Sequence, residues 1–276
     1  PDADVPESAE EETAGGERGS ALPLLERPVE ERMRLVLGNR FIDLARLADV
    51  LACPMPKAET GAAAARLERF WDGLMTIERF ADHARRSQLT PLRKALRDYV
   101  LVYRASALLV DDAETPCTIE TLKDLFATRF VSASDRSLWY ARLPFYRETP
   151  SEGHWALLDG QYLNSTFKRP KIRLAMYARA NGLPQSAVRQ KSVLEDVYDR
   201  AVVDTALDGL FFHNCNSLTR TTYQQKDESS KKQVYVYYRD AQIRISGKRG
   251  VPHWRPGKPR WPGVLPAVVF DQRARP

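Results

Sequence analysis

The sequence has no long hydrophobic run and few cysteines. No stretch approaches the ~18 uninterrupted apolar residues that a membrane helix needs, and even the apolar segment 99–110 is broken by Arg104. The three cysteines, Cys53, Cys117 and Cys215, are odd in number and widely spaced. This spacing argues against a disulfide framework and favours a reducing intracellular compartment. We therefore predict a protein that is not inserted in a membrane and is not held together by disulfide bonds.

Metal-binding and catalytic signatures are also missing. The histidines share no ligand-like spacing with one another or with the cysteines, so a structural zinc is not expected. Glycine-rich phosphate loops are absent as well. His213 and Cys215, with Asp208 nearby, combine a base with a nucleophile, but neighbours in sequence seldom form a catalytic pair. We expect no cofactor and no enzymatic activity, and an enzyme built on these three residues remains an alternative.

Charge is divided unevenly along the 276 residues. Ten acids and two arginines fall within residues 1–31, a local balance of −8, which leaves +14 on the rest of a chain whose net charge is +6. Acidic segments that contain proline, glycine and serine are typical of disordered arms. The sequence therefore predicts an acidic disordered arm over residues 1–27, followed by a basic remainder that attracts polyanions.

Helical periodicity dominates residues 28–130, which we interpret as one helical domain. Apolar residues recur at spacings of three and four, and Pro28, Thr90-Pro91 and Thr118 are typical of helix starts. Helices with short connections favour a bundle or a helical stack. The predicted helices span residues 28–37, 41–51, 62–86, 90–108 and 118–130.

The second half predicts less regular structure and then a small sheet. Periodicity fades over residues 131–165, which we interpret as a structured connector. Val234, Val236 and Tyr238 alternate with Tyr235 and Tyr237, and Ile243 and Ile245 alternate with Arg244, as in the strands of a hairpin. Residues 218–225 are a candidate third strand. The segment 166–246 is thus predicted to hold a helical pair and a β hairpin or meander. The fold class expected is mainly α: a helical bundle or stack, a small antiparallel meander and an extended basic tail.

The predicted tail, residues 247–276, begins with the most distinctive segment of the chain. Residues 247–263 hold five cations, two tryptophans, four prolines and four glycines, and no acid. Cations neutralise phosphates, and tryptophan and arginine stack on unpaired bases. We therefore predict RNA binding here, with packing of the tail on its own domain as the alternative. The candidate contacts are Lys248, Arg249, Trp254, Arg255, Lys258, Arg260 and Trp261.

A second basic segment, residues 160–194, also lacks acids. Its candidate nucleic-acid contacts are Lys168, Arg169, Lys171, Arg173, Arg179, Arg189 and Lys191. Within it, residues 177–190 resemble the helix-turn-helix of bacterial regulators, with Asn181-Gly182 at the turn. That resemblance implies that Gln185, Ser186 and Arg189 face bases in a major groove of DNA. The acidic pair Glu195-Asp196 that follows is interpreted as a solvated helix face.

The overall layout of the chain resembles that of lineage-specific mitochondrial ribosomal proteins, of the kind found in kinetoplastid protists. It combines an acidic arm, a helical body, a small sheet and a basic tail that contains proline and tryptophan. The resemblance covers the tail and the overall layout. It implies a non-catalytic structural subunit in a mitochondrion, with ribosomal RNA and neighbouring proteins as partners. A DNA-binding regulator of the helix-turn-helix type is the alternative from another class.

Overall fold

The structure is a computed structural model that describes residues 22–130, 139–160, 163, 170–208, 211–212, 217–224, 232–239, 242–247 and 265–270. The helices of this part are α1 (Val29–Leu37), α2 (Leu44–Leu51), α3 (Lys57–Met75), α4 (Glu78–Arg85), α5 (Leu89–Ala95), α6 (Ile119–Leu125), α7 (Pro170–Ala180) and α8 (Val193–Ala206). Short 3-10 helices are η1 (Leu24–Glu26), η2 (Gly38–Arg40), η3 (Ala127–Arg129), η4 (Trp139–Arg142) and η5 (Pro144–Tyr146). The strands are β1 (Phe41–Ile42), β2 (Tyr99–Arg104), β3 (Ala107–Val110), β4 (Ala113–Pro116), β5 (His154–Asp159), β6 (Val188–Gln190), β7 (Ser217–Tyr223), β8 (Lys232–Arg239), β9 (Gln242–Ser246) and β10 (Pro266–Val268).

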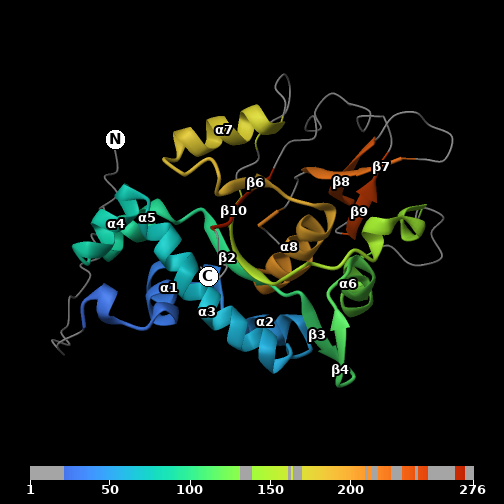
Figure 1. Cartoon of the computed structure of the whole chain (residues 1–276), viewed down its shortest axis with the longest axis horizontal. Coiled ribbons are helices and arrows are strands. Elements are labelled where there is room, and N and C mark those ends of the chain that lie inside the picture. Colours follow the sequence, from blue (N-terminus) through green and yellow to red (C-terminus); the bar gives the residue numbers. More distant parts are fainter. Residues whose placement is uncertain are drawn as a thin grey trace, which may run out of the picture.

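A mixed five-stranded sheet with the order β1-β2-β5-β10-β6 forms the centre of the fold. Strand β1 runs parallel to β2, and each of the other neighbouring pairs is antiparallel. Strands β2 and β5 pair over their whole length, which places Arg104 directly opposite His154. Strand β10 comes from far along the chain and lies between β5 and β6 (Figure 1).

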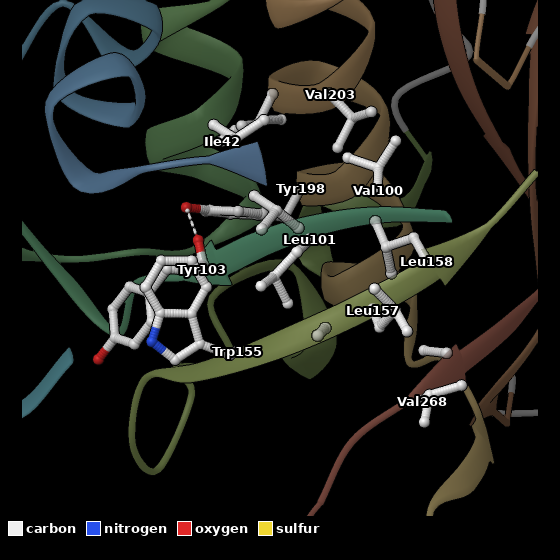
Figure 2. Packing of buried hydrophobic residues seen from close by; sticks show 14 of the residues in the cluster. Ile42, Val100, Leu101, Tyr103, Trp155, Leu157, Leu158, Tyr198, Val203 and Val268 are labelled. Carbon is white, nitrogen blue, oxygen red and sulfur yellow. Dashed lines mark hydrogen bonds between the residues drawn. The ribbon is translucent and has the colours of Figure 1, made fainter. Parts of the chain in front are cut away.

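Both faces of the central sheet are covered by helices. Because side chains alternate along a strand, Tyr103 and Trp155 point to one face, where the Trp155 indole donates a hydrogen bond of 2.8 Å to the Ala63 carbonyl in α3. The opposite face carries Arg104 and packs against α8, where the Arg104 guanidinium reaches Asp199. Figure 2 shows the same core, with the Tyr198 hydroxyl of α8 donating to the Tyr103 carbonyl of β2.

Helix α8 lies between two sheets. It packs on β2 of the central sheet and on the antiparallel meander β7-β8-β9, with α2 and α6 against it as well. Every residue from Val193 to Asp204 is therefore buried. A helix enclosed in this way is normally apolar all round, but α8 carries five charged residues within that span: Glu195, Asp196, Asp199, Arg200 and Asp204.

The prediction of a mainly α fold is wrong. The protein is a mix of helices and sheets, with the five-stranded central sheet, the two-stranded hairpin β3-β4 and the predicted meander β7-β8-β9. The error began at residues 90–108, predicted as one helix, where the chain forms α5 and then the strands β2 and β3. The run Tyr99–Arg104 is buried at every position, and a fully buried strand shows no alternation that distinguishes it from a helix.

Two other central strands fall where no strand was expected. Strand β5 lies inside the predicted connector, and β10 lies inside the segment predicted as an extended tail. The Leu265, Ala267 and Val268 side chains are buried there, so the chain returns to the core after the basic segment. Residues 248–264, which include all seven candidate RNA contacts of the predicted tail, lie outside the described residues.

Several local predictions are confirmed. Helix α1 begins after Pro28 and ends before Gly38, and the Thr118 side chain accepts a hydrogen bond from the Thr121 amide as an N-cap. The long helix predicted over 62–86 is broken at Thr76 and Ile77 into α3 and α4. In the part of the chain that the structure describes, no helix is both long and apolar enough to span a bilayer.

Gly73 of α3 offers a test of how the returning chain is held. A Cβ at this position would lie 2.4 Å from the Phe270 ring, whereas a Cβ at Gly61 of the same helix would meet nothing within 4 Å. We expect Gly61→Ala to stabilise the protein by up to about 1 kcal/mol through helix propensity. We expect Gly73→Ala to destabilise it by about 1–3 kcal/mol because Phe270 must move. Urea denaturation of the two variants measures the difference, and equal shifts in the midpoint would contradict the packing.

Candidate functional site

The first turn of α8 is fixed by a capping box. The Ser192 hydroxyl accepts a hydrogen bond from the Glu195 amide, at 3.2 Å, and the Glu195 carboxylate accepts one from the Ser192 amide, at 2.6 Å. This reciprocal pair satisfies two amide groups that a helix start leaves without partners. It also holds the Glu195 carboxylate at the end of the helix, facing the strands β2, β5 and β6.

Glu195 is surrounded by cations from three different strands. Arg104 from β2 lies 3.1 Å from its carboxylate, and Arg220 from β7 lies 3.4 Å away. Arg189 from β6 donates a hydrogen bond to the same oxygen, Oε1, that faces Arg104. Burial alone would raise the pKa of Glu195, but the charges of Arg104, Arg189 and Arg220 lower it to about 2. The carboxylate is therefore ionised at neutral pH.

A second layer of ion pairs lies deeper in the protein. Asp199 accepts two hydrogen bonds from Arg104, at 2.6 and 2.9 Å, and lies 2.8 Å from the Lys191 ammonium. These two cations hold the pKa of Asp199 below its ordinary value despite burial, which acts in the opposite direction. One turn away, Asp196 accepts a hydrogen bond from the Ser217 hydroxyl and lies 3.5 Å from the Arg200 guanidinium. The charges of α8 are thus paired rather than exposed.

His154 opens β5 beside this group of cations. Its Nε2 lies 2.7 Å from Arg189 Nη2 and 3.4 Å from Arg104 Nη1, and both of these nitrogens are donors. Nε2 must therefore accept, which leaves the proton of the neutral ring on Nδ1. Burial, followed by the charges of Arg104 and Arg189, lowers the pKa of His154 to about 3. The imidazole is uncharged at neutral pH and serves as an acceptor for the arginines.

These residues form one wall of a cavity of about 500 Å³. Arg66, Arg104, Arg189 and Arg220 line it, as do His154, Glu195 and the loop of residues 148–153 that leads into β5. Leu194, Val269 and Phe270 add apolar surface to its lining. The volume is within the range of small-molecule sites, about 300–1,000 Å³. A concave surface with convergent cations and an apolar side is suited to binding an anion that carries an apolar part.

The structure separates the basic residues that the sequence grouped together. Lys171 and Arg179 are exposed on α7, Arg173 is half-buried on the same helix, and Lys168 and Arg169 lie outside the described residues. Arg189 lines the cavity. Lys191 is only 2% exposed and pairs with Asp199, so its ammonium is not presented at the surface.

The helix-turn-helix expected over residues 177–190 does not form. Helix α7 ends at Ala180, and Gly182 takes the left-handed conformation, with φ at 61°, as the turn required. The predicted second helix is instead a turn followed by strand β6, which pairs with β10. Gln185 and Ser186 therefore lie in a turn rather than on a recognition helix.

Sequence reasoning missed the ionic centre of the site. Glu195 and Asp196 were interpreted as solvated, but they are 8% and 0% exposed. The signal that locates the helix start was present as Ser192-x-x-Glu195, the capping-box spacing. No comparable signal marked Arg104, His154 or Arg220, because each lies on a different strand and is brought to Glu195 only by the pairing of the sheets.

Among the described residues, no group of three or more histidine, cysteine, aspartate or glutamate side chains could hold a metal ion. Asp208 is exposed in the turn after α8, and His213 and Cys215, its partners in the proposed catalytic group, lie outside the described residues. Comparison of the chain with protein-family models, with curated proteins and with solved structures found no significant match.

The buried imidazole predicts a pH-dependent stability. An unfolded histidine binds a proton with a pKa of about 6.5, whereas folded His154 does so only at about 3. The unfolded state therefore binds more protons as the pH falls below 6.5, and the free energy of unfolding decreases. The slope contributed by this residue approaches about 1.4 kcal/mol per pH unit. His154→Gln, which keeps an acceptor, should remove that contribution.

The measurement is the free energy of unfolding in urea between pH 5 and pH 7. Glu195 does not disturb this window, because its folded pKa of about 2 and the unfolded glutamate value of about 4.3 both lie below it. Parallel curves for the wild-type chain and His154→Gln would show that the folded imidazole titrates as it does in the unfolded chain.

Proposed function

We propose that the chain is a non-catalytic, RNA-binding structural subunit of a large ribonucleoprotein, in its most specific form a mitochondrial ribosome. The observation that carries this proposal is the surface of α7, which lies at the outer edge of the molecule (Figure 1). Lys171 and Arg179 are exposed there and have no ion-pair partner among the described residues, and the helix contains no acid. Unpaired surface cations are available to neutralise phosphates.

The same helix also presents apolar side chains. Ile172 and Met176 are 49% and 52% exposed, and they are two of the four large hydrophobic residues that are exposed in the described structure. Apolar side chains of this size on a surface are typical of contacts with another protein. A helix that offers cations and apolar residues together is suited to a position between RNA and a neighbouring subunit.

The basic segment 247–263 supports the proposal from the sequence, with five cations and two tryptophans and no acid. The described residues on its two sides are held in the fold. Tyr223 donates a hydrogen bond to the Gly247 carbonyl, and Leu265 is 1% exposed at the start of β10. Gly247 and Leu265 are therefore both anchored in the fold, so RNA bound to the residues between them would be joined to the core by the chain on both sides.

We expect a variant with Lys248, Arg249, Arg255, Lys258 and Arg260 replaced by glutamine to bind structured RNA more weakly and with less dependence on salt. If all five cations contact phosphates, the slope of log Kobs against log salt should fall by up to about 3.5 for single-stranded RNA. Lys171→Gln with Arg179→Gln should lower it further, by up to about 1.4. Filter binding across a salt series measures both changes.

The matched control exchanges lysine and arginine at the same five positions and so keeps every charge. It should retain the wild-type slope. If the glutamine variant and the charge-preserving control bind structured RNA equally well, RNA binding through this segment is ruled out. Membership of a large ribonucleoprotein is tested by sedimentation of a native extract, in which the protein should move with a large particle and leave it after nuclease treatment.

A further inference from the structure

The cavity beside Glu195 is lined by four arginines and three glutamates, Glu148, Glu152 and Glu195, so arginine is in excess by one. Arg104 is satisfied by Asp199, which accepts two hydrogen bonds from it, and Arg66 pairs with Glu152 at 3.2 Å. Arg189 and Arg220 have no such partner of their own. Both face the single carboxylate of Glu195, which also lies 3.1 Å from Arg104.

The two arginines are accessible from the cavity, and Arg189 is incompletely satisfied. The buried Nε of Arg189 has no hydrogen-bond partner among the described residues. The Arg189 and Arg220 side chains are 33% and 49% exposed, and both line the cavity. A guanidinium group presents several donors in a planar fork and binds carboxylate and phosphate with paired hydrogen bonds. Two such groups at one wall therefore provide more donors than Glu195 accepts.

The positions of the arginines are set by the sheet pairing rather than by flexible loops. Arg189 is the central residue of β6 and pairs with Ala267 of β10. The backbone amide of Arg220 donates to the Lys191 carbonyl at 2.8 Å, which fixes β7 beside the end of β6. His154 accepts from Arg189 at 2.7 Å and remains uncharged. Paired strands therefore hold both arginines at the cavity.

The rest of the cavity favours a phosphate over a simple carboxylate. Thr149, Ser151 and Ser186 line it and add hydroxyl groups on the side that faces solvent. Phosphate offers more acceptor oxygens, and in more directions, than a carboxylate does, so it can use the arginines and the hydroxyls together. Val269 and Phe270 also line the cavity and provide an apolar surface for the remainder of a ligand.

We propose that this cavity is a binding site for a phosphomonoester, held by Arg189 and Arg220, either on a free small molecule such as a nucleoside monophosphate or at the phosphorylated end of an RNA. The described residues that line the cavity include none from α7, and the proposal does not depend on the proposed role of α7 or of the basic segment 247–263. Its ligand contacts come from β6, β7 and the loop before β5, and the apolar part of the ligand lies against Phe270.

The test uses isothermal titration calorimetry of the full chain with four probes. These are inorganic phosphate, adenosine 5′-monophosphate, and one short RNA carrying either a 5′-phosphate or a 5′-hydroxyl. Arg220→Gln should weaken binding of the phosphate-bearing probes by at least about tenfold, because it removes charge-assisted hydrogen bonds. Arg220→Lys keeps the charge but not the fork, and should recover only part of the affinity.

Two further variants separate the cavity from general surface charge. Arg85→Gln removes an arginine on α4 that is 66% exposed and does not line the cavity, and it should bind as the wild type does. Ser186→Phe places a large ring at an exposed position on the rim without changing any charge, and it should block the ligand. Thermal unfolding of each variant verifies that the protein is folded.

The outcomes are distinct. If adenosine monophosphate or inorganic phosphate binds and Arg220→Gln and Ser186→Phe abolish it, the ligand is a small molecule. If only the 5′-phosphorylated RNA binds in this way, and the 5′-hydroxyl RNA does not, the ligand is an RNA end. If no probe binds, or if binding survives both Arg220→Gln and Ser186→Phe or is weakened equally by Arg85→Gln, the proposal is overturned. The glutamine variant of segment 247–263 should keep its affinity for the small probes, so failure of one proposal is distinguishable from failure of the other.

Discussion

Helix α8 can be buried only because each of its charged side chains has a partner on a neighbouring element. Asp196 and Asp199 are 0% exposed, and an isolated carboxylate at such a depth would cost several kcal/mol of desolvation free energy. Their partners come from β2, from β7, from the residue after β6 and from α8 itself. Pairing these charges therefore requires the central sheet and the meander to lie in one fixed relation to the helix.

Such a network is not in itself a source of stability. A buried ion pair often gains little relative to apolar residues of the same volume, whereas the loss of one partner is costly. A register shift of one residue in β6 would turn Arg189 to the other face of the sheet and leave Glu195 with fewer cations. The candidate ligand site lies where this network reaches the cavity, at Arg189 and Arg220, which share the carboxylate of Glu195.

The sequence predicted the elements whose signals are local. Helix α1 and the cap of α6 depend on residues next to them, and the meander shows clear alternation, so all three could be recognised. The central sheet could not, because β2 and β5 are short apolar runs buried on both faces and β6 and β10 have only three residues each. Among the residues of the candidate site, the sequence indicated Arg189, but as a nucleic-acid contact, and the capping box at Ser192 could have located Glu195. Arg104, His154 and Arg220 could not be assigned to the site from the sequence, because only the pairing of the strands brings them to Glu195.

The position of β10 has a consequence for how the protein is made. It is the last strand that the structure describes along the chain, yet it lies between β5 and β6. Until it is inserted, those two strands have unpaired edges, and such edges readily pair with other chains. A nascent chain halted before Pro266 would therefore expose the unpaired edges of β5 and β6 in the central sheet. The central sheet can therefore close only after residues 266–268 have been synthesised and are free to insert between β5 and β6.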